Sequence, residues 1–421
     1  MIFIKLKISI MFNRITITAI ASVILLSCVG NNSGKRNSDN GDNNKSQLNL
    51  EELKNVETGE MLLLVGTYTS KEGSKGVYVY RFNTETGNSD SVSMVEAENP
   101  SYLALSPRHD YVYAVSEGQN GGVYSFSLDK SSGTLTPINF QSTLESSPCY
   151  ITINQTGKNI HTANYGGGSI TSFQVNHDGS LTPAKSVISF EGSGPDSTRQ
   201  ESPHLHIVMF TYKQDYLFAA DLGSDKLYRF STSNSPFEGQ PNIDKRSLKE
   251  FEMPPRTGPR HFAFHPNGDK YLYVLGELSG EILVYDYENG EISHKQTVVA
   301  DSVGARGSAD IHISPNGRYL YASNRLQADG IAIFSINSND GTLTKVGYQH
   351  TARHPRNFVI THNGKYLLVA CRDDNKIQVF QLNSETGMLT NINKDIQVNM
   401  PVCLKLAAIN NYGLSEADIY E

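Results

Sequence analysis

Residues 259–277 read PRHFAFHPNGDKYLYVLGE, and this stretch decides the fold. An alternating apolar strand, a Pro-Asn-Gly turn and a second strand of the type Tyr-Leu-Tyr-Val together describe one β-hairpin. The same pattern returns at residues 308–325 (SADIHISPNGRYLYASNR) and 355–372 (PRNFVITHNGKYLLVACR). The chain is therefore built from repeats of one supersecondary unit.

Hairpins of this type open at seven positions that lie 46–56 residues apart. Further strands, such as residues 330–337 and 376–383, follow the hairpins, which gives about four strands per unit. A four-stranded unit of this length is typical of a β-propeller blade. A helical period of 3.6 residues is nowhere sustained, which excludes helix-rich folds. The openings are residues 100, 148, 203, 259, 308, 355 and 401.

The two ends of the repeat region complement each other. Residues 61–66 (MLLLVG) match the second strand of a unit without its first, and residues 401–409 (PVCLKLAAI) match a first strand without its second. Pairing these two strands closes the ring and removes exposed sheet edges. We therefore predict an all-β fold, one seven-bladed propeller of four-stranded blades, over residues 61–421.

The N-terminal residues are typical of an export signal. Basic residues precede an apolar run at residues 15–26, which is too short to span a bilayer and ends in Leu-Leu-Ser-Cys. This ending resembles the lipobox of bacterial lipoproteins, so we predict a signal peptide over residues 1–27, a lipidated Cys28 and a flexible tether over residues 28–60. The protein is then an exported lipoprotein anchored in the outer membrane, facing the periplasm or the cell surface. An ordinary secretory signal with a chance cysteine is the alternative.

Composition excludes several classes of function. The chain carries 36 Lys and Arg against 43 Asp and Glu and no long basic run, so nucleic acid is not an expected partner. It has no Trp, which excludes the usual WD40 and TPR repeats. Cys149, Cys371 and Cys403 lie in apolar strand-like runs and are interpreted as small buried residues. Neither a Gly-x-Ser-x-Gly elbow nor a phosphate-binding loop is present, which argues against serine-triad hydrolysis and nucleotide chemistry.

The repeat also predicts where polar residues gather. If the first strand of each unit lines the central channel and the second runs antiparallel to it, first-strand starts and second-strand ends meet at one mouth. Such a collection of polar and ionisable groups is typical of a ligand site, although channel mouths in propellers are also simply hydrated. The positions are Ser101, Cys149, His204, Arg260, His261, Ala309, Asp310 and Arg356 at strand starts, and Tyr68, Glu117, Asn164, Tyr165, Asp221, Glu277, Asn324, Arg325 and Arg372 at strand ends.

His204 and His206 form a Pro-His-x-His motif. Residues two apart in a strand face the same side, so both imidazoles are expected to project together. Two imidazoles could chelate a metal, but no third ligand stands at a metal-motif spacing. A general base or a substrate hydrogen-bond donor is the favoured interpretation, and a structural histidine is the alternative.

The three arginines Arg260, Arg325 and Arg356 indicate an anionic substrate, because guanidinium groups bind carboxylate or phosphate with two parallel hydrogen bonds. Pairing with local carboxylates is the alternative. Among arginines, Glu277 is expected to be ionised and able to act as a base or to orient water.

At these residues the sequence resembles the seven-bladed lactonase family, typified by the propeller-type 6-phosphogluconolactonase and the fungal carboxymuconate-lactonising enzyme. The resemblance implies metal-independent chemistry, without a cofactor, on a lactone or its ring-opened acid. It assigns catalytic roles to a histidine of the Pro-His-x-His strand, Arg260, Glu277 and Arg325. The matching motifs run in family order: Gly66-Thr67-Tyr68-Thr69, Ser202-Pro203-His204-Leu205-His206, Asp221-Leu222-Gly223-Ser224-Asp225, Gly258-Pro259-Arg260-His261, Gly276-Glu277-Leu278, Ser323-Asn324-Arg325 and His354-Pro355-Arg356.

We therefore expect a lactone hydrolase resembling 6-phosphogluconolactonase. Water is activated by His204 or His206 together with Glu277, while Arg260 and Arg325 stabilise the oxyanion. Arg356 holds the anionic group of the substrate, and the further substrate contacts are Tyr68, Asp221, His261 and Asn324.

Two other functions stay open. A cycloisomerase that forms a lactone from a muconate-like diacid would use the same arginines, and a non-catalytic propeller would bind an anionic glycan or a protein. Outside the cytoplasm a phosphorylated sugar lactone is scarce, so the preferred lactone is open as well. A closed propeller needs no partner for stability, and we predict a monomer.

Overall fold

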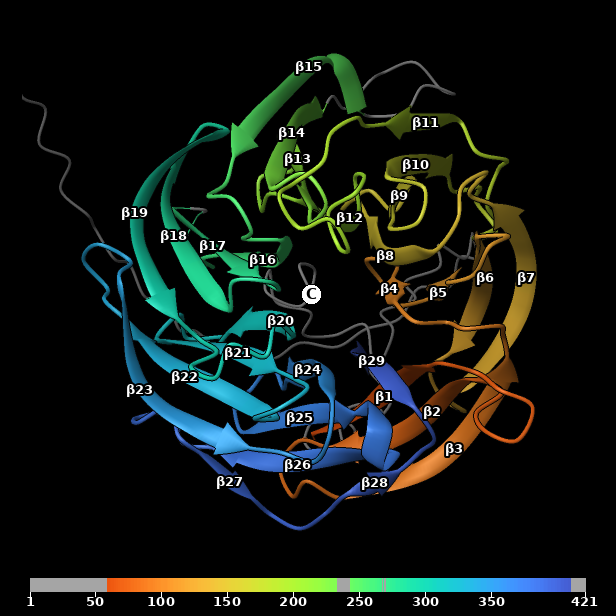
Figure 1. Ribbon diagram of the computed structural model, residues 1–421. Coiled ribbons are helices and arrows are strands. Elements are labelled where there is room, and N and C mark those ends of the chain that lie inside the picture. The colour runs from red at the N-terminus through yellow and green to blue at the C-terminus, as the bar shows by residue number, and fades with distance from the viewer. Residues whose placement is uncertain (1–58, 233–242, 267, 269, 410–421) are drawn as a thin grey trace, which may run out of the picture. The chain divides into compact units, whose positions relative to one another are not determined.

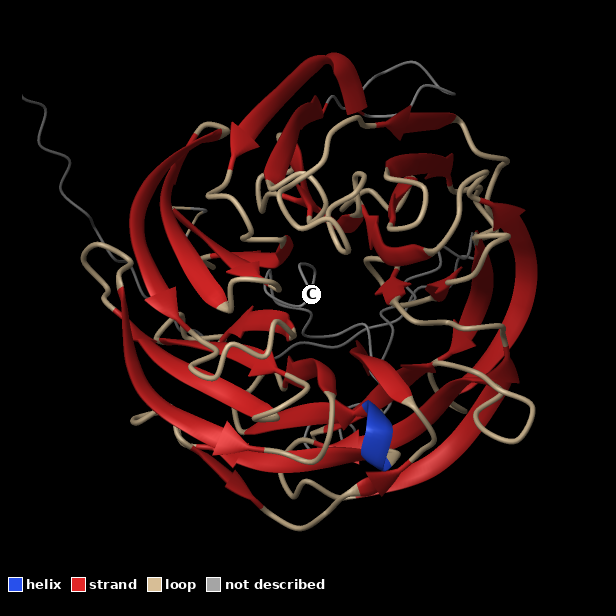
Figure 2. Cartoon of the chain, in the orientation of Figure 1, coloured by secondary structure: helices blue, strands red, loops and turns tan. Residues whose placement is uncertain are grey.

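The computed structural model describes residues 59–232, 243–266, 268 and 270–409. Their strands form seven sheets arranged in a ring around a common axis (Figure 1), which confirms the predicted all-β, seven-bladed propeller. Figure 2 shows strands throughout, with η1 (Arg372–Asp374) as a single-turn helix. None of the described residues form a helix long and apolar enough to cross a membrane. The predicted signal peptide, Cys28 and nearly all of the tether lie outside the described residues.

Six of the blades use consecutive strands, each antiparallel to the next. The first three of them, from the inner strand outward, are β4 (Leu103–Leu105), β5 (Tyr111–Ser116), β6 (Gly122–Asp129) and β7 (Thr134–Ser142); β8 (Pro148–Ile153), β9 (Asn159–Asn164), β10 (Ser169–Gln174) and β11 (Ser186–Ser189); and β12 (Leu205–Phe210), β13 (Tyr216–Asp221), β14 (Lys226–Thr232) and β15 (Ile243–Glu252).

The next three blades follow the same order, except that the outer edge of the last is shared by two short strands, β27 and β28, which both pair with β26. These blades are β16 (Pro259–Phe264), β17 (Tyr271–Gly276), β18 (Glu281–Glu288) and β19 (Glu291–Val299); β20 (Ser308–Ile313), β21 (Tyr319–Asn324), β22 (Gly330–Ile336) and β23 (Leu343–His350); and β24 (Pro355–Ile360), β25 (Tyr366–Cys371), β26 (Lys376–Leu382), β27 (Leu389–Asn391) and β28 (Ile396–Gln397).

The seventh blade joins the two ends of the described chain. Its sheet order is β29-β1-β2-β3, and β29 pairs antiparallel with β1 from Met61 opposite Ala408 to Gly66 opposite Cys403. This pairing confirms the predicted ring closure, and both strands are buried along almost their whole length. The blade consists of β29 (Pro401–Ala408), β1 (Glu60–Thr67), β2 (Gly76–Asn83) and β3 (Ser89–Glu96).

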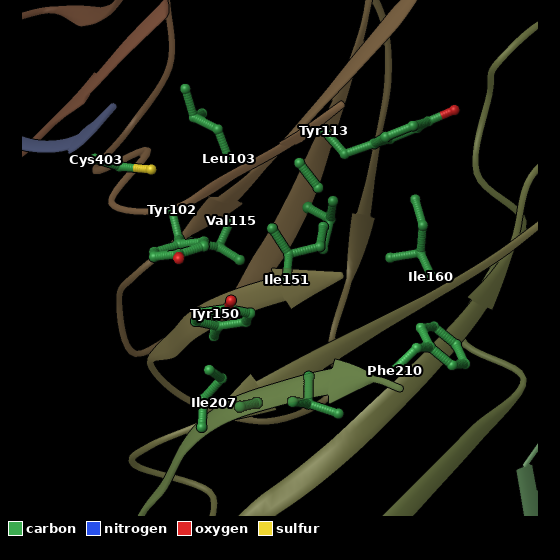
Figure 3. Packing of buried hydrophobic residues seen from close by; sticks show 14 of the residues in the cluster. Tyr102, Leu103, Tyr113, Val115, Tyr150, Ile151, Ile160, Ile207, Phe210 and Cys403 are labelled. Atoms are coloured by element: carbon green, nitrogen blue, oxygen red, sulfur yellow. The ribbon is translucent and has the colours of Figure 1, made fainter. Parts of the chain in front are cut away.

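Packing between blades explains why the second strand of a blade is buried on both faces. β21 and β25 are buried at every residue, whereas the outermost β15 alternates between half-buried and exposed positions. Side chains of neighbouring inner strands interdigitate, and Tyr102 stacks on Tyr150 with ring centroids 4.0 Å apart (Figure 3). The predicted small buried residues Cys149, Cys371 and Cys403 are indeed buried and unbridged.

The Tyr-Leu-Tyr motif of the repeat links each blade to the next. In β17 the ring of Tyr271 packs on Gly341, in the outer turn of the following blade, and the Tyr273 hydroxyl donates to the Gly341 carbonyl at 2.9 Å. Gly341 has φ +73°, and an added Cβ would lie 2.5 Å from the Tyr271 ring, so only glycine fits. The same hydrogen bond joins Tyr113 to Gly179 and Tyr321 to Gly387.

We expect Gly341→Ala to destabilise the propeller more than Gly304→Ala. Both glycines adopt positive φ, but nothing lies within 4 Å of a Cβ at Gly304. The shared backbone strain costs about 1–2 kcal/mol, and the clash with Tyr271 adds roughly 1–3 kcal/mol for the first variant only. Urea unfolding of both variants measures the difference, and equal losses would show that the contact with Tyr271 is not tight.

Candidate functional site

A buried carboxylate organises one mouth of the propeller. Glu277 follows β17, and its Oε2 lies 2.9 Å from Arg260 Nε and 3.4 Å from Arg325 Nη2. All three side chains are at least nine-tenths buried although they come from two neighbouring blades. The structure thus brings together three of the predicted catalytic residues.

A fourth member of this cluster, Arg199, is absent from the sequence-based expectation. It comes from the loop between β11 and β12, and its Nη2 lies 2.8 Å from Glu277 Oε1. Two side chains anchor this loop. Gln200 is fully buried and donates to the Leu222 carbonyl at 2.9 Å, and Asp196 forms an ion pair with Arg306. Strand periodicity cannot place a loop residue. The 55-residue interval before residue 203 is the sequence signal that indicates extra chain here.

The charge of Glu277 is set by its arginine neighbours. Burial by itself raises the pKa of the carboxyl, but Arg325, Arg260 and Arg199 outweigh burial and lower the pKa to about 2. Burial in turn lowers the pKa of the Arg325 guanidinium, and burial and the nearby Arg356 lower that of Arg260. Each of these cations would therefore be stabilised by a bound anion.

Arg356 completes the positive charge at this mouth. Its guanidinium lies 5.3 Å from the ring centroid of Tyr68, and its Nη2 is 4.0 Å from Glu117 Oε2. The Tyr68 hydroxyl donates to both oxygens of Glu117, at 3.1 and 3.0 Å, and burial raises the pKa of this phenol. Arg356 lies 4.0 Å from the Glu117 carboxylate, whereas Arg260 lies 2.9 Å from that of Glu277. The Arg356 guanidinium is therefore more available to a ligand.

A β-bulge near the start of the inner strands aims these side chains. The register of β16 against β17 shifts between Pro259 and His261, so Arg260 is an extra residue without a partner across the sheet. Bulges re-aim side chains and are common beside active sites. The corresponding extra residues are Cys149 in β8, His206 in β12 and Arg356 in β24, and the bulge of β20 spans Ala309 and Asp310.

The bulge in β12 separates the two predicted histidines. His204 precedes the strand, stacks on Tyr165 at 4.4 Å and lies with Nδ1 2.9 Å from the Tyr165 carbonyl. His206 occupies the bulge, as Arg260 and Arg356 do in their blades, and its ring centroid is 5.2 Å from that of His261. Burial, Arg260, His261 and Arg356 hold the pKa of His206 well below its usual range, so it is a neutral imidazole.

The remaining predicted contacts lie at the edge of the site or below it. Asp221 accepts from the backbone N–H groups of His204 and Gly223 at 2.7 and 2.9 Å, and Asn324 lies between Ser308 and the Ala300 carbonyl. Both are engaged within the protein scaffold, and their role as substrate contacts stays a prediction. His261 lies one residue beyond Arg260 and pairs with Asp310 at 2.7 Å. Arg372 contacts His354 at 3.2 Å on the rim.

A cavity of about 590 Å³ lies toward the opposite mouth, near the turns at Pro266 and Pro315. His261 and Asp310 belong to its wall, but the arginine cluster does not. Aromatic and apolar side chains make up most of the cavity wall. An anionic ligand therefore suits the mouth that carries Arg199, Arg260, Arg325 and Arg356, called the arginine mouth below, better than it suits this cavity. Over the described ranges no group of three or more His, Cys, Asp or Glu side chains is arranged to hold a metal ion.

Removal of the Glu277 charge is expected to destabilise the protein, because Glu277→Gln leaves buried guanidinium groups without their counter-charge. The loss should be about 3–5 kcal/mol at pH 7, whereas Glu385→Gln, in an exposed ion pair, should cost less than about 1 kcal/mol. The folded pKa lies below the unfolded value of 4.5, so this stabilisation is complete above pH 4.5. It falls by up to about 1.4 kcal/mol per pH unit toward pH 2. Denaturant unfolding at pH 7 and 3.5 tests this, and a pH-independent difference would contradict it.

Comparisons with known proteins agree with the seven-bladed fold. The family described as "Lactonase, 7-bladed beta-propeller" matches residues 62–406. The chain is 37% identical over 345 residues to a 6-phosphogluconolactonase of Formosa agariphila, a match that covers 80% of this chain and 97% of that protein.

Two solved structures have the same architecture. A Bacteroides fragilis protein provisionally assigned as a 6-phosphogluconolactonase is 50% identical, with a TM-score of 0.80 over 83% of this chain and 98% of that one. The Pseudomonas aeruginosa periplasmic gluconolactonase PpgL is 29% identical, with a TM-score of 0.77 over 83% of this chain and 100% of that one.

Proposed function

The chain belongs to the seven-bladed β-propeller lactonase family, and we propose that it hydrolyses a sugar-acid lactone at the arginine mouth. It is a lactone hydrolase that resembles 6-phosphogluconolactonase. The observation that carries the proposal is the buried cluster in which Glu277 holds Arg260, Arg325 and Arg199 around one carboxylate.

Arg260 and Arg325 place positive charge where the lactone carbonyl oxygen becomes negative during the reaction. Attack of water on the lactone carbonyl produces a tetrahedral oxyanion, and preorganised cationic donors stabilise such a charge most strongly in a dry site. Arg260 and Arg325 supply these donors, since both are buried and fixed by Glu277. Because the carboxylate is shared among several guanidinium groups, part of their charge is left for the substrate.

His206 is the base in this proposal. Its imidazole is neutral, stands at the bulge position that aims Arg260 and Arg356, and lies beside the arginine cluster. His204 is held by Tyr165 outside the strand. Glu277 has a pKa of about 2 and gives both oxygens to guanidinium groups, so it positions the arginines and does not itself take the proton from water.

The proposed hydrolysis opens the lactone ring in two steps. The water oxygen bonds to the carbonyl carbon while one water proton moves to His206, and the ring C–O bond then breaks as that proton passes to the leaving alkoxide. The products are a hydroxy acid, which ionises, and the regenerated neutral imidazole. The new carboxylate stays near Arg260 and Arg325, whose pKa values burial lowers, so its binding is favourable.

The substrate is an anionic or strongly polar sugar lactone. Arg199, Arg260, Arg325 and Arg356 outnumber the carboxylates Glu117 and Glu277 at this mouth. Arg356 suits a phosphate or carboxylate on the substrate, because guanidinium binds both in a two-pronged geometry. The relatives are named for 6-phosphogluconolactone and for gluconolactone, and both are candidates.

A proton-release assay on the purified protein tests the proposal, with 6-phosphogluconolactone and gluconolactone offered in the presence and absence of a chelator. We expect turnover that survives the chelator, falls about 10²-fold in Arg260→Ala and falls similarly in His206→Gln. His204→Gln should retain much more activity. If the wild-type protein hydrolyses neither lactone, the hydrolase proposal is wrong, and a muconate cycloisomerase or a binding propeller takes its place.

We also infer export with a lipid anchor at Cys28. The apolar run at residues 15–26 and the following Leu-Leu-Ser-Cys support it, as does the likeness to a periplasmic gluconolactonase. The wild-type chain should incorporate labelled fatty acid and sediment with membranes. Cys28→Ala should lose the label and appear in the soluble fraction, whereas Cys149→Ala should retain it. A Cys28→Ala variant that is still labelled would contradict the anchor.

A further inference from the structure

We propose that Asp310, His261 and His206 form a buried proton relay behind the arginine mouth. In this relay His206 takes a proton from water on Nε2 and passes its Nδ1 hydrogen to His261, and Asp310 stabilises the resulting imidazolium. The catalytic use of the relay rests on the proposed lactonase function, but the relay itself is a property of the three side chains.

Asp310 is the fixed negative end of the relay. Its carboxylate is buried and accepts hydrogen bonds from His261 and His312, and the nearby imidazoles keep its pKa well below the usual range. Further donors hold both oxygens in place. They are the Ile311 N–H at 3.1 Å, the Asn357 side-chain amide at 2.5 Å and the Phe358 N–H at 3.2 Å.

The hydrogen bond to Asp310 determines the tautomer of His261. Since a carboxylate only accepts, the Nδ1 that lies 2.7 Å from Asp310 Oδ1 carries the hydrogen, and Nε2 keeps a lone pair. This Nε2 is buried and has no hydrogen-bond partner among the described residues. Burial and Arg260 lower the pKa of His261 to about 4, while Asp310 opposes them, so the ring is neutral at rest.

His206 presents a matching unpartnered nitrogen. Its Nδ1 is buried and likewise lacks a partner within the described part of the chain. The two rings are adjacent, with centroids 5.2 Å apart and planes inclined by 69°. Buried polar atoms are nearly always hydrogen-bonded, so two unpartnered atoms on neighbouring rings point to a hydrogen bond between them that a small ring movement completes. A proton shared between His206 Nδ1 and His261 Nε2 satisfies both atoms at once.

The surrounding charges give the transfer its direction. Arg260 disfavours positive charge on both rings and Arg356 adds to this at His206, whereas of the two rings only His261 is in direct contact with Asp310, which favours positive charge there. Tyr102 and Tyr150, which stack on each other in Figure 3, also lie near His261, with ring centroids 6.1 and 5.4 Å from its ring. The titratable and charged groups that face the two imidazoles are Arg260, Arg356, Asp310, His312, Tyr102, Tyr150, Tyr165 and Cys149.

The relay conserves every proton. At rest His206 carries its hydrogen on Nδ1, and its Nε2 accepts one proton from the attacking water. The Nδ1 hydrogen then moves to His261 Nε2, which leaves His206 neutral and His261 as an imidazolium bonded to Asp310. When the ring C–O bond breaks, His206 Nε2 gives its proton to the alkoxide and the Nδ1 hydrogen returns from His261.

Histidine titration by NMR tests the relay without any turnover. In purified protein labelled with ¹⁵N-histidine, the titration midpoint of His206 should shift by at least half a pH unit in His261→Gln and in Asp310→Asn. It should not move in His265→Gln, directly after the end of β16, where the His265 Nε2 lies 3.0 Å from the Gly317 carbonyl. If His206 titrates identically in all variants, the relay is wrong. Should Asp310→Asn fail to fold, His261→Gln decides alone.

The pH profile of lactone hydrolysis tests the catalytic use. Loss of the Asp310 charge lowers the pKa of His261, so Asp310→Asn should lower the plateau by about 10²-fold and move the acidic limb to lower pH. A merely structural role would lower the plateau without moving the limb, and His265→Gln should change neither. If the wild-type protein turns over no lactone but its histidines are coupled in the NMR titration, the proposed function fails while the relay stands. Turnover without such coupling overturns the relay alone.

Discussion

The pairing of β1 with β29 is the constraint on which the rest of the structure depends. Only a closed ring points every inner strand toward one axis and brings all seven strand starts to the same mouth. Arg356, near the end of the described chain, meets Tyr68 and Glu117, near its start, only because the ring is closed. The site is therefore a property of the whole ring and of no single blade.

Within that ring, a bulge repeated in the inner strands aims several of the predicted site residues. The flanking residues of each inner strand stay in the sheet, while the extra residue is released from cross-strand pairing. Different blades use the same local geometry for different chemistry, an imidazole at His206 and guanidinium groups at Arg260 and Arg356. The scaffold stays rigid because the strands on either side of each bulge remain hydrogen-bonded.

The charged groups at this end of the propeller form two layers, an upper layer around Glu277 at the mouth and a lower layer around Asp310 behind it. In the upper layer Glu277 is outnumbered by guanidinium groups, which suits an anionic ligand and a developing oxyanion. In the lower layer Asp310 is saturated by hydrogen-bond donors and holds His261 in one tautomer. His206 lies between the two layers. Burial together with Arg260 and Arg356 keeps its imidazole neutral, and the ring of His261, which is hydrogen-bonded to Asp310, lies 5.2 Å away between centroids.

The sequence by itself determined the architecture, because hydrophobic alternation and turn residues are local signals that repeat with the blade. The seven openings, the closure between residues 61–66 and 401–409, and the gathering of Arg260, Glu277 and Arg325 at one mouth all follow from that periodicity. Periodicity could not show the bulges, since an extra residue breaks the alternation on which the prediction rests, and so His204 and His206 stayed equivalent. Only the tertiary structure separated them, brought Arg199 in from a loop and placed Asp310 behind His261, because these contacts join residues that no local pattern connects.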